Sequence, residues 1–236
     1  MHEPDLTKIL ALIPAYNEAD RIGRVIDGAR QFLPVLVVDD GSTDDTATIA
    51  TGQGASVLYQ VPNQGKGAAL KAGFRQAISE EYHAVVTLDA DGQHDPSEIP
   101  KFLTSFRNSK PDLIIGARDF SQIPPVGRLA NTLGRWSFSW AVGQHIPDNQ
   151  SGYRLISRRL MAALLDSRES GFEFEVEMIV TCLQTGCRLE WLPIRTIYAG
   201  ERSHIHPLRH LFLFSRMVWR TKKRMKQVSL ANARRI

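Results

Sequence analysis

Two aspartates, Asp89 and Asp91, directly follow an apolar run in the stretch TLDADGQHDP (87–96). In extended backbone, side chains at positions i and i+2 point to the same face, so both carboxylates could reach one site. Two acids brought together repel each other unless a cation lies between them, and oxygen ligands suit Mg²⁺ or Mn²⁺. Such a cation could bridge to diphosphate oxygens and stabilise a diphosphate leaving group. The pair taken alone is also consistent with an acidic turn in solvent.

The end of this stretch is expected to start a helix. Asp95 precedes Pro96, and Asp before Pro is typical of a helix N-terminus, so we expect Asp95 to be a cap. His94 receives no role from the sequence.

A second acidic stretch, VVDDGSTDDT (37–46), ends another apolar run. An acid at a strand end can accept hydrogen bonds from ribose hydroxyls or from a base, and we expect Asp40 to do so. Asp39 is predicted to be structural, and Ser42, Thr43 or Asp44 is predicted to cap the next helix.

The stretch PAYNE (14–18) follows the first apolar run of the chain. Tyr16 could pack on a nucleobase. Glu18 could accept a hydrogen bond from that base, or could favour the N-terminus of a helix.

The elements that must position these residues alternate in type along the first half of the chain. Apolar runs expected as buried strands lie at 8–13, 35–38, 55–59, 84–88 and 113–116, with helices expected at 17–32, 44–52, 65–79 and 96–106. This alternation predicts an α/β fold with a mainly parallel sheet covered by helices on both faces. Ligands bind at the carboxyl ends of the strands in such sheets, which is where the polar stretches fall.

The second half of the chain is less regular. We expect helices at 127–143 and 171–186, strands at 152–156 and 188–198, and a last helix at 207–226. We therefore expect one domain over 1–206 and a helical appendage over 207–236. The N-terminus is unlike a signal peptide and no apolar run is long enough to span a bilayer. Cys182 and Cys187 are expected to be buried thiols, and a cytoplasmic location is expected.

The motifs taken together and in order resemble a known family. PAYNE, VVDDGSTDDT, NQGKGAALKAGF, LDADGQHDP and GAR resemble the motifs of family-2 glycosyltransferases of the GT-A fold. The most similar branch contains the dolichyl-phosphate mannose synthases and the bacterial polyprenyl-phosphate glycosyltransferases. The resemblance covers 8–205. It implies a GT-A fold and an inverting transfer of a sugar from a nucleoside-diphosphate sugar, such as a GDP- or UDP-sugar, with Mg²⁺ or Mn²⁺.

The resemblance also implies roles for individual residues. The nucleotide contacts would be Pro14, Tyr16, Glu18, Val38, Asp40, Lys66 and Ala90. The metal and diphosphate site would be Asp89, Asp91 and Gln93. Lys66 belongs to the glycine-rich loop, where its charge could face sugar or phosphate, or could lie in solvent.

The acceptor side is implied in the same way. The acceptor phosphate would contact Arg118, Arg128, Thr132, Arg135 and Ser151, although the residues at 128–135 could instead form a basic helix face. Asp148 is a further candidate near the sugar. The loop YAGERSHIHP (198–207) would place Arg202, Ser203 and His204 on the diphosphate. Catalysis would rest on Asp89, Asp91, Arg118 and Arg202.

An acceptor class follows from what the chain lacks. Many family-2 enzymes carry a late E-D-D or Q-x-x-R-W signature for the catalytic base, and neither occurs after residue 130. A phosphate monoester is already an anion near neutral pH and needs no strong base, which favours a polyprenyl phosphate acceptor. A soluble or saccharide acceptor, or a non-catalytic nucleotide-sugar-binding subunit at the membrane, stays open. A hydride-transferring dinucleotide enzyme is disfavoured, because PAYNE replaces G-x-G-x-x-G.

The C-terminal tail is strongly basic. From Arg202 onward there are ten Lys and Arg and no acid, although the whole chain has a net charge of only +4. On a helical projection the apolar side holds Leu208, Leu211, Phe212, Phe214, Met217, Val218, Trp219 and Met225, opposite Arg209, Arg216, Arg220 and Lys223. This favours an interfacial helix on an anionic membrane, peripheral to its cytoplasmic face or held by a membrane-protein partner. Packing of the apolar side against the domain is the alternative. Nucleic acid is disfavoured, because the body of the protein is acidic.

Overall fold

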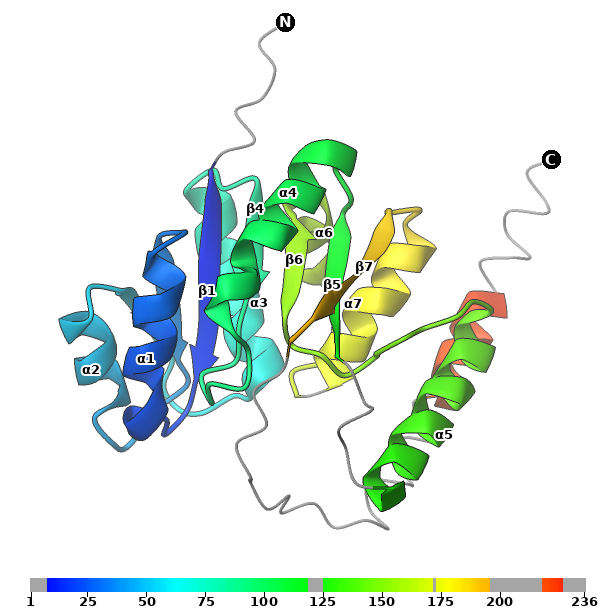
Figure 1. The fold of residues 1–236 in the computed structure, drawn as a ribbon, viewed down its shortest axis with the longest axis horizontal. Helices are drawn as coiled ribbons and strands as arrows, with labels where there is room; N and C mark the ends of the chain where they lie inside the picture. Colours follow the sequence, from blue (N-terminus) through cyan, green and yellow to red (C-terminus); the bar gives the residue numbers. More distant parts are fainter. Residues whose placement is uncertain (1–7, 119–124, 172, 196–217, 227–236) are drawn as a thin grey trace, which may run out of the picture.

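The computed structural model of the protein describes residues 8–118, 125–171, 173–195 and 218–226. Its centre is a seven-stranded sheet in the order β3-β2-β1-β4-β6-β5-β7 (Figure 1). The strands are β1 (Ile9–Ala15), β2 (Val35–Asp39), β3 (Ser56–Tyr59), β4 (Ala84–Thr87), β5 (Leu113–Arg118), β6 (Arg154–Ser157) and β7 (Leu189–Ile194). Only β6 runs antiparallel, to both β4 and β5. The expected mainly parallel α/β sheet is confirmed.

Helices cover both faces of this sheet. The helices are α1 (Ala19–Arg30), α2 (Thr46–Gly52), α3 (Lys66–Ser79), the 3-10 turn η1 (Pro96–Glu98), α4 (Ile99–Ser109), α5 (Pro125–Val142), α6 (Arg158–Leu164) and α7 (Glu173–Gln184). One apolar core lies between the sheet and α1, α2 and α4, and a second lies between the sheet and α3, α5, α6 and α7. Strand β1 alternates between them, with Leu10 and Leu12 in the second core and Ile9, Ala11 and Ile13 in the first. This is why the strand is apolar at every position.

The edges of the sheet correct one expectation. The run 55–59 was expected as a buried strand, but β3 is the outer strand of the sheet and the side chain of Tyr59 is 62% exposed. An edge strand has a neighbour on one side only. Its apolar side chains are therefore half-covered, a difference that the sequence pattern does not reveal.

The C-terminal appendage is described only at 218–226, which is helical. Val218 and Thr221 are buried, and Met225 packs against the second core. Arg224 donates to Glu177 of α7 at 2.6 and 2.9 Å. Part of the apolar side thus packs on the domain, as the alternative interpretation held, whereas Trp219 is 70% exposed. The predicted boundary at 206/207 and the helix over 207–217 lie outside the described residues.

Two further expectations concern the cysteines and the membrane. Cys182 and Cys187 are both free and buried, as predicted. Within the ranges that the structure describes, no helix combines the length and the apolar character needed to cross a bilayer.

Candidate functional site

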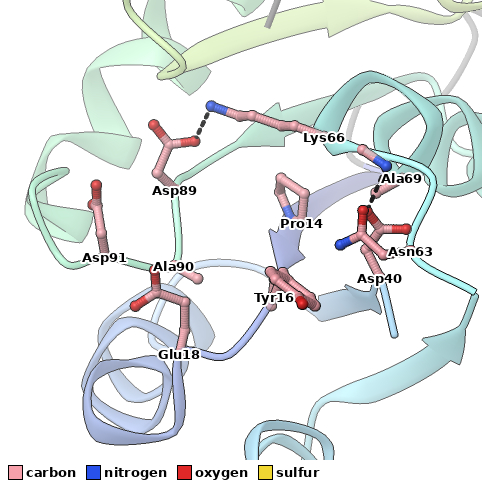
Figure 2. A pocket seen from close by; sticks show the side chains of 12 residues that line it. Pro14, Tyr16, Glu18, Asp40, Asn63, Lys66, Ala69, Asp89, Ala90 and Asp91 are labelled. Carbon is pink, nitrogen blue, oxygen red and sulfur yellow. Dashed lines mark hydrogen bonds and ion pairs between the residues drawn. The ribbon is translucent and has the colours of Figure 1, made fainter. Parts of the chain in front are cut away.

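The carboxyl ends of β1, β2 and β4 meet at one cleft of about 440 Å³ (Figure 2). The cleft is lined by residues at or after the ends of β1, β2 and β4 and by residues at and just before the start of α3, namely Pro14, Ala15, Tyr16, Glu18, Asp40, Asn63, Gly65, Lys66, Ala69, Asp89, Ala90 and Asp91. Most of the predicted nucleotide contacts and both predicted metal carboxylates therefore lie together. Val38 differs, because its side chain is fully buried in the core beneath the cleft.

Hydrogen bonds join the turn after β1 to the turn after β2. Asn17, which has φ 54°, accepts a hydrogen bond from the Thr43 amide at 2.8 Å, and its own amide donates to Ser42 Oγ at 3.0 Å. Asp44 accepts from the amides of Ala19 and Thr46, at the starts of α1 and α2. None of the three predicted caps holds the N-cap position of α2, which is Asp45; Asp44 stands one residue earlier and accepts from the first amide of the helix. This arrangement leaves the Tyr16 ring 49% exposed at the cleft.

Asp40 shapes the loop that leads into α3. Its carboxylate accepts from Gln60 Nε2 at 2.6 Å, from the Gln64 amide at 2.9 Å and from the Gly65 amide at 2.7 Å. Asp40 lines the cleft as predicted, but both of its oxygens already hold loop donors. A ligand there would meet a carboxylate fixed in place by the main chain. Asp39, which accepts from the Ser42 amide at 3.3 Å, has the structural role expected of it.

The acidic side chains of Glu18, Asp89 and Asp91 line the same cleft (Figure 2). Burial raises the pKa of Glu18 above its ordinary value; the charge of Arg21 opposes this shift, and the carboxylates of Asp91, Asp44 and Asp89 add to it. Asp91 accepts from the Gln93 amide at 2.9 Å, so its own turn holds the carboxylate at the cleft. A bound cation would relieve the repulsion among these carboxylates.

The donor set fits a shared divalent cation better than a closed metal site. Within the described ranges no group of three or more His, Cys, Asp or Glu residues is placed to hold a metal. Mg²⁺ and Mn²⁺ are commonly held by one or two carboxylates together with phosphates of the substrate. Asp89 and Asp91 beside an open cleft, with the amide group of Gln93 next to them in sequence, provide this kind of donor set.

Lys66 lies at the centre of the site and not in solvent, which corrects one of the two interpretations of this residue. Its Nζ is 2.5 Å from Asp89 Oδ1 and 2.6 Å from Glu175 Oε1, and its side chain is 17% exposed. Burial would lower the pKa of Lys66, but the two carboxylates outweigh it and raise that pKa above its ordinary value. Burial alone would raise the pKa of Asp89, but the ammonium of Lys66 and, more weakly, the guanidinium of Arg118 lower it to about 2. Asp89 is thus ionised at neutral pH.

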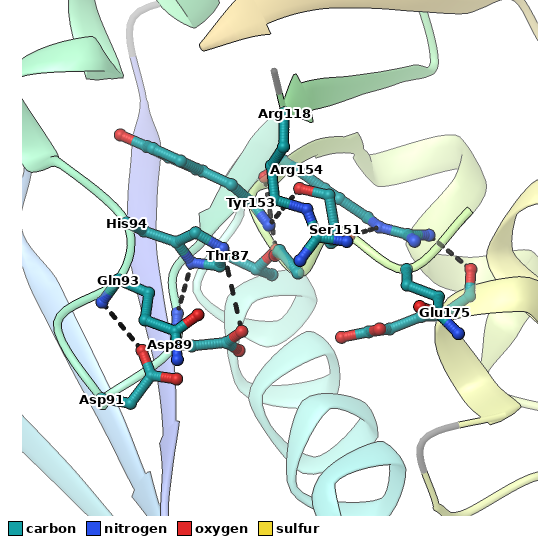
Figure 3. A network of polar contacts seen from close by, with 12 residues as sticks. Thr87, Asp89, Asp91, Gln93, His94, Arg118, Ser151, Tyr153, Arg154 and Glu175 are labelled. Atoms are coloured by element: carbon teal, nitrogen blue, oxygen red, sulfur yellow. Dashed lines mark hydrogen bonds and ion pairs between the residues drawn. The ribbon is translucent and has the colours of Figure 1, made fainter. Parts of the chain in front are cut away.

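Two residues fix the position of Asp89, namely His94, whose contacts Figure 3 shows, and Gly152. The Asp89 amide donates to His94 Nδ1 at 3.0 Å, and the imidazole packs against the Tyr153 ring with centroids 5.0 Å apart. Burial lowers the pKa of His94, which keeps the ring neutral and able to accept. A Cβ atom at Gly152 would lie 2.6 Å from Asp89 Oδ2, so only glycine leaves room for the carboxylate.

Replacing Gly152 with Ala should therefore displace the Asp89 carboxylate with little effect on the fold. The clash falls on the end of a side chain and not on main chain. We expect Mn²⁺ affinity, measured by electron paramagnetic resonance of free Mn²⁺, to fall about tenfold, while the unfolding temperature changes little. Gly52 provides a matched control in the same chain, because it is exposed at the end of α2, has no positive φ, and a Cβ there meets nothing within 4 Å. Unchanged Mn²⁺ affinity in G152A would contradict this account.

A second group of polar residues lies at the end of β5 (Figure 3). Arg118 Nε donates to Asp148 Oδ2 at 2.7 Å, and Nη2 donates to Asp148 Oδ1 at 3.0 Å. The Asp148 carboxylate is 1% exposed, so the guanidinium is held in one orientation while keeping 22% of its own side chain exposed. Arg118 therefore lies where its field acts on Asp89 and His94.

The other predicted acceptor residues are placed differently. Arg135 donates to the Pro147 carbonyl at 3.0 Å and to Thr132 Oγ1 at 3.3 Å, and Thr132 is exposed. Ser151 is fully buried, and its Oγ accepts from the Tyr153 amide at 3.4 Å, so its side chain does not face an open site. Arg128 belongs to α5, but its side chain lies outside the described residues, as do Arg202, Ser203 and His204 in full.

The predicted cap at Asp95 is confirmed. Asp95 is the N-cap of η1 and accepts from the Ser97 amide at 2.9 Å. The acidic stretch is therefore divided as expected, with Asp95 starting a helix and Asp89 and Asp91 facing the cleft.

Sequence reasoning missed several residues of this site. Arg154 is fully buried and donates to the carbonyls of Ser151 and Glu175, so it ties the 149–152 loop to α7. Asn63 lines the cleft from the loop before α3. Glu175 reaches Lys66 across a separation of 109 residues. Gly152 and Arg154 lie in the stretch NQSGYR (149–154), beside the predicted residues Asp148 and Ser151, whereas nothing near Glu175 in sequence marks it.

Comparison with known proteins agrees with this geometry. A model of the family described as "Glycosyl transferase family 2" matches residues 11–164. The chain belongs to this family. The glycosyltransferase is 34% identical over 206 residues to undecaprenyl-phosphate mannosyltransferase of Micrococcus luteus, covering 79% of the chain and 82% of that relative. It is 30% identical over 212 residues to polyprenol monophosphomannose synthase of Mycolicibacterium smegmatis, covering 79% and 76%. These relatives place it with the polyprenyl-phosphate branch.

A solved structure supports the GT-A fold. Glucosyl-3-phosphoglycerate synthase of Mycobacterium tuberculosis, in complex with Mn²⁺, UDP-glucose and phosphoglyceric acid, superimposes with a TM-score of 0.72. The match covers 93% of this chain and 80% of that one at 22% identity. At this identity the likeness is one of fold.

Proposed function

We propose that this glycosyltransferase moves a sugar from a nucleoside-diphosphate sugar to a polyprenyl phosphate at an anionic membrane surface, with a divalent cation in the donor site. The observation that carries the proposal is the cleft where Asp89 and Asp91 face Tyr16 and Asp40. A nucleoside diphosphate has a ring to pack, hydroxyls to bind and a charged diphosphate. Along the sheet edge the cleft offers the fixed carboxylate of Asp40 after β2, the exposed ring of Tyr16 after β1, and the carboxylate pair suited to a cation after β4.

The chemistry of the transfer needs few protein groups. An oxygen of the acceptor phosphate attacks the anomeric carbon, the bond from that carbon to the diphosphate breaks, and the nucleoside diphosphate leaves with the electron pair. Mg²⁺ or Mn²⁺, held by Asp89, Asp91 and Gln93, would neutralise charge on the leaving diphosphate. Because a phosphate monoester has its second pKa near 6, the attacking oxygen needs no base at neutral pH. Arg118, held by Asp148, would orient the acceptor phosphate.

A lipid acceptor is supported by the names of the relatives and by one face of the molecule. Exposed tryptophans lie on α5, at Trp136 and Trp140, and on the segment 218–226, at Trp219. The two segments are joined, because Lys222 Nζ donates to the Trp140 carbonyl at 2.9 Å and lies 4.6 Å from its ring centroid. We name Trp136, Trp140 and Trp219 the tryptophan face.

This tryptophan face has the composition of a membrane-contacting surface. Tryptophan rings favour the headgroup region of a bilayer, and basic side chains beside them are attracted to anionic lipids. Arg220, Lys223 and Lys226 are exposed on the same segment as Trp219. The tryptophan face would thus hold the enzyme where a polyprenyl phosphate presents its phosphate.

Removing the tryptophan face should release the protein from vesicles. The triple variant W136A/W140A/W219A is expected to lose at least about tenfold in partitioning to vesicles containing phosphatidylglycerol, because the buried aromatic area is lost. Co-sedimentation measures this. Y59A is the control, since Tyr59 is equally exposed but lies on β3 at the other edge of the sheet. Wild-type protein that stays in the supernatant would contradict membrane contact and favour a soluble acceptor.

The donor half of the proposal is tested separately. UDP, GDP and their hexose conjugates are added with Mn²⁺, and the shift in unfolding temperature identifies the bound nucleotide. The bound donor is then incubated with a short polyprenyl phosphate, and the lipid-linked sugar is measured. No stabilisation by any nucleotide would overturn the donor site. Stabilisation with transfer only to a water-soluble acceptor would overturn the lipid acceptor alone.

A further inference from the structure

Lys66 is shared between two carboxylates that belong to different parts of the site. Asp89 Oδ1 lies 2.5 Å from its Nζ, and Glu175 Oε1 lies 2.6 Å from it. Asp89 is a candidate ligand of the divalent cation at the end of β4. Glu175 lies in the first turn of α7 and is not among the candidate ligands.

Glu175 is the more firmly held of the two acids. Its side chain is 9% exposed, against 25% for Asp89, and its main-chain carbonyl accepts from the guanidinium of Arg154. Helices α3 and α7 are also locked together at this point. A Cβ at Gly67 would lie only 2.7 Å from Phe174 Cβ, so the backbone that carries Lys66 abuts the turn that carries Glu175.

A cation at Asp89 changes the balance between these two partners. The ammonium of Lys66 already contacts one oxygen of the Asp89 carboxylate, so a divalent cation on the same carboxylate would lie close to a like charge. Repulsion then favours the arrangement in which Lys66 leaves Asp89. Whether the ammonium stays in the site depends on its second partner.

We propose that Glu175 is a positioning residue, which retains Lys66 beside the donor's diphosphate when the divalent cation takes over the Asp89 carboxylate. The inference rests on the proposed cation-dependent donor site. Glu175 acts through Lys66 and not by touching the donor. The cluster thus has one arrangement without the cation, with Lys66 on both acids, and another with it, with Lys66 on Glu175 and the diphosphate.

An ordinary ion pair that only joins α3 to α7 predicts something different. Breaking such a pair would lower the unfolding temperature and leave ligand affinities unchanged. If Glu175 acted only through its negative charge, the Mn²⁺ affinity would depend on a carboxylate at position 175 but not on how far that carboxylate extends. The proposal requires both the charge and the contact with Lys66. Variants that change the charge and the side-chain length separately therefore distinguish the structural ion pair, the general charge effect and the proposed positioning role.

Variants at Glu175 test this with Mn²⁺ itself. E175Q removes the charge, and E175D keeps the charge but draws it back by one methylene. In both, Lys66 is left to Asp89 and competes with the cation, so we expect the Mn²⁺ dissociation constant, measured from the resonance of free Mn²⁺, to rise about tenfold. E173Q is the control, because Glu173 is an exposed acid on the same turn.

Lys66 provides the complementary test. K66M removes the competing ammonium, so we expect tighter Mn²⁺ binding without nucleotide and weaker binding of UDP and GDP with Mn²⁺, two shifts of opposite sign. If the Glu175 variants fail to fold, K66M still tests the competition between Lys66 and the cation, without which Glu175 has no such role. Wild-type Mn²⁺ affinity in E175D, or unchanged Mn²⁺ and nucleotide affinities in K66M, would overturn the role of Glu175 while leaving the donor site intact. Wild-type protein that binds no Mn²⁺ would overturn the cation site and this inference with it.

Discussion

Replacing Asp91 with Asn is expected to lower kcat/KM for sugar transfer about 1000-fold, equivalent to about 4 kcal/mol of transition-state stabilisation. Asn keeps the shape of the side chain and an oxygen that can accept from the Gln93 amide, so the turn should survive. What is lost is one of the two carboxylate charges that would hold the proposed divalent cation. Steady-state transfer at saturating Mn²⁺ measures the effect, and the unfolding temperature should change little.

The same acidic stretch supplies the matched control. D95N makes the identical change four residues away, at a side chain that caps η1, and Asn caps helices about as well as Asp. Its kcat/KM should stay close to that of the wild type. Chelation with EDTA should abolish transfer in the wild type, and added Mn²⁺ should restore it. Transfer by D91N at the wild-type rate, or transfer that survives EDTA, would refute a cation held by Asp91.

The sequence was most informative where local chemistry and sheet topology coincide. Parallel strands end at a common edge, so polar stretches after β1, β2 and β4 had to lie near one another once the alternation of elements was recognised. Asp95 was predictable for a similar reason, since a helix cap depends on adjacent residues only. These inferences need no knowledge of how distant segments pack.

Contacts between distant segments were not predictable. Glu175 and Lys66 meet only because α7 packs against α3, and Glu175 stands in a run, FEFEVE, that reads as an ordinary helix start. Ser151 was expected at the acceptor, but it lies just before β6, an inner strand between β4 and β5, and is fully buried. The polarity of a residue indicates that it needs a partner. It does not indicate whether that partner is a ligand or the protein itself.

Arg118 shows this ambiguity most clearly, and its substitution should separate the two kinds of partner. Arg118→Met would leave the Asp148 carboxylate, which is 1% exposed, without its cation. Because removing one member of a buried pair is costly, we expect the free energy of unfolding to fall by about 3 kcal/mol, measured by chemical denaturation. Arg118→Lys keeps the charge but cannot reproduce the two parallel bonds, so the loss should be about 1 kcal/mol. R159K is the control, since Arg159 is largely exposed and its pair with Asp112 is long, at 3.6 Å.

The transfer activity of R118K then decides whether the pairing of Arg118 with Asp148 has a function beyond stabilising the fold. In R118K the guanidinium that Asp148 holds in one orientation is replaced by a mobile ammonium, so the acceptor phosphate of the proposed reaction would lose its fixed partner. We expect transfer to fall about 100-fold, because small misplacements of reacting groups have effects of this size. Stabilisation by nucleotide and Mn²⁺ should be unchanged, since Arg118 is not part of the cleft lining. Wild-type transfer by R118K would show that Arg118 serves Asp148 alone, and loss of nucleotide binding would show that it serves the donor. Only the combination of intact donor binding and failed transfer assigns Arg118 to the acceptor.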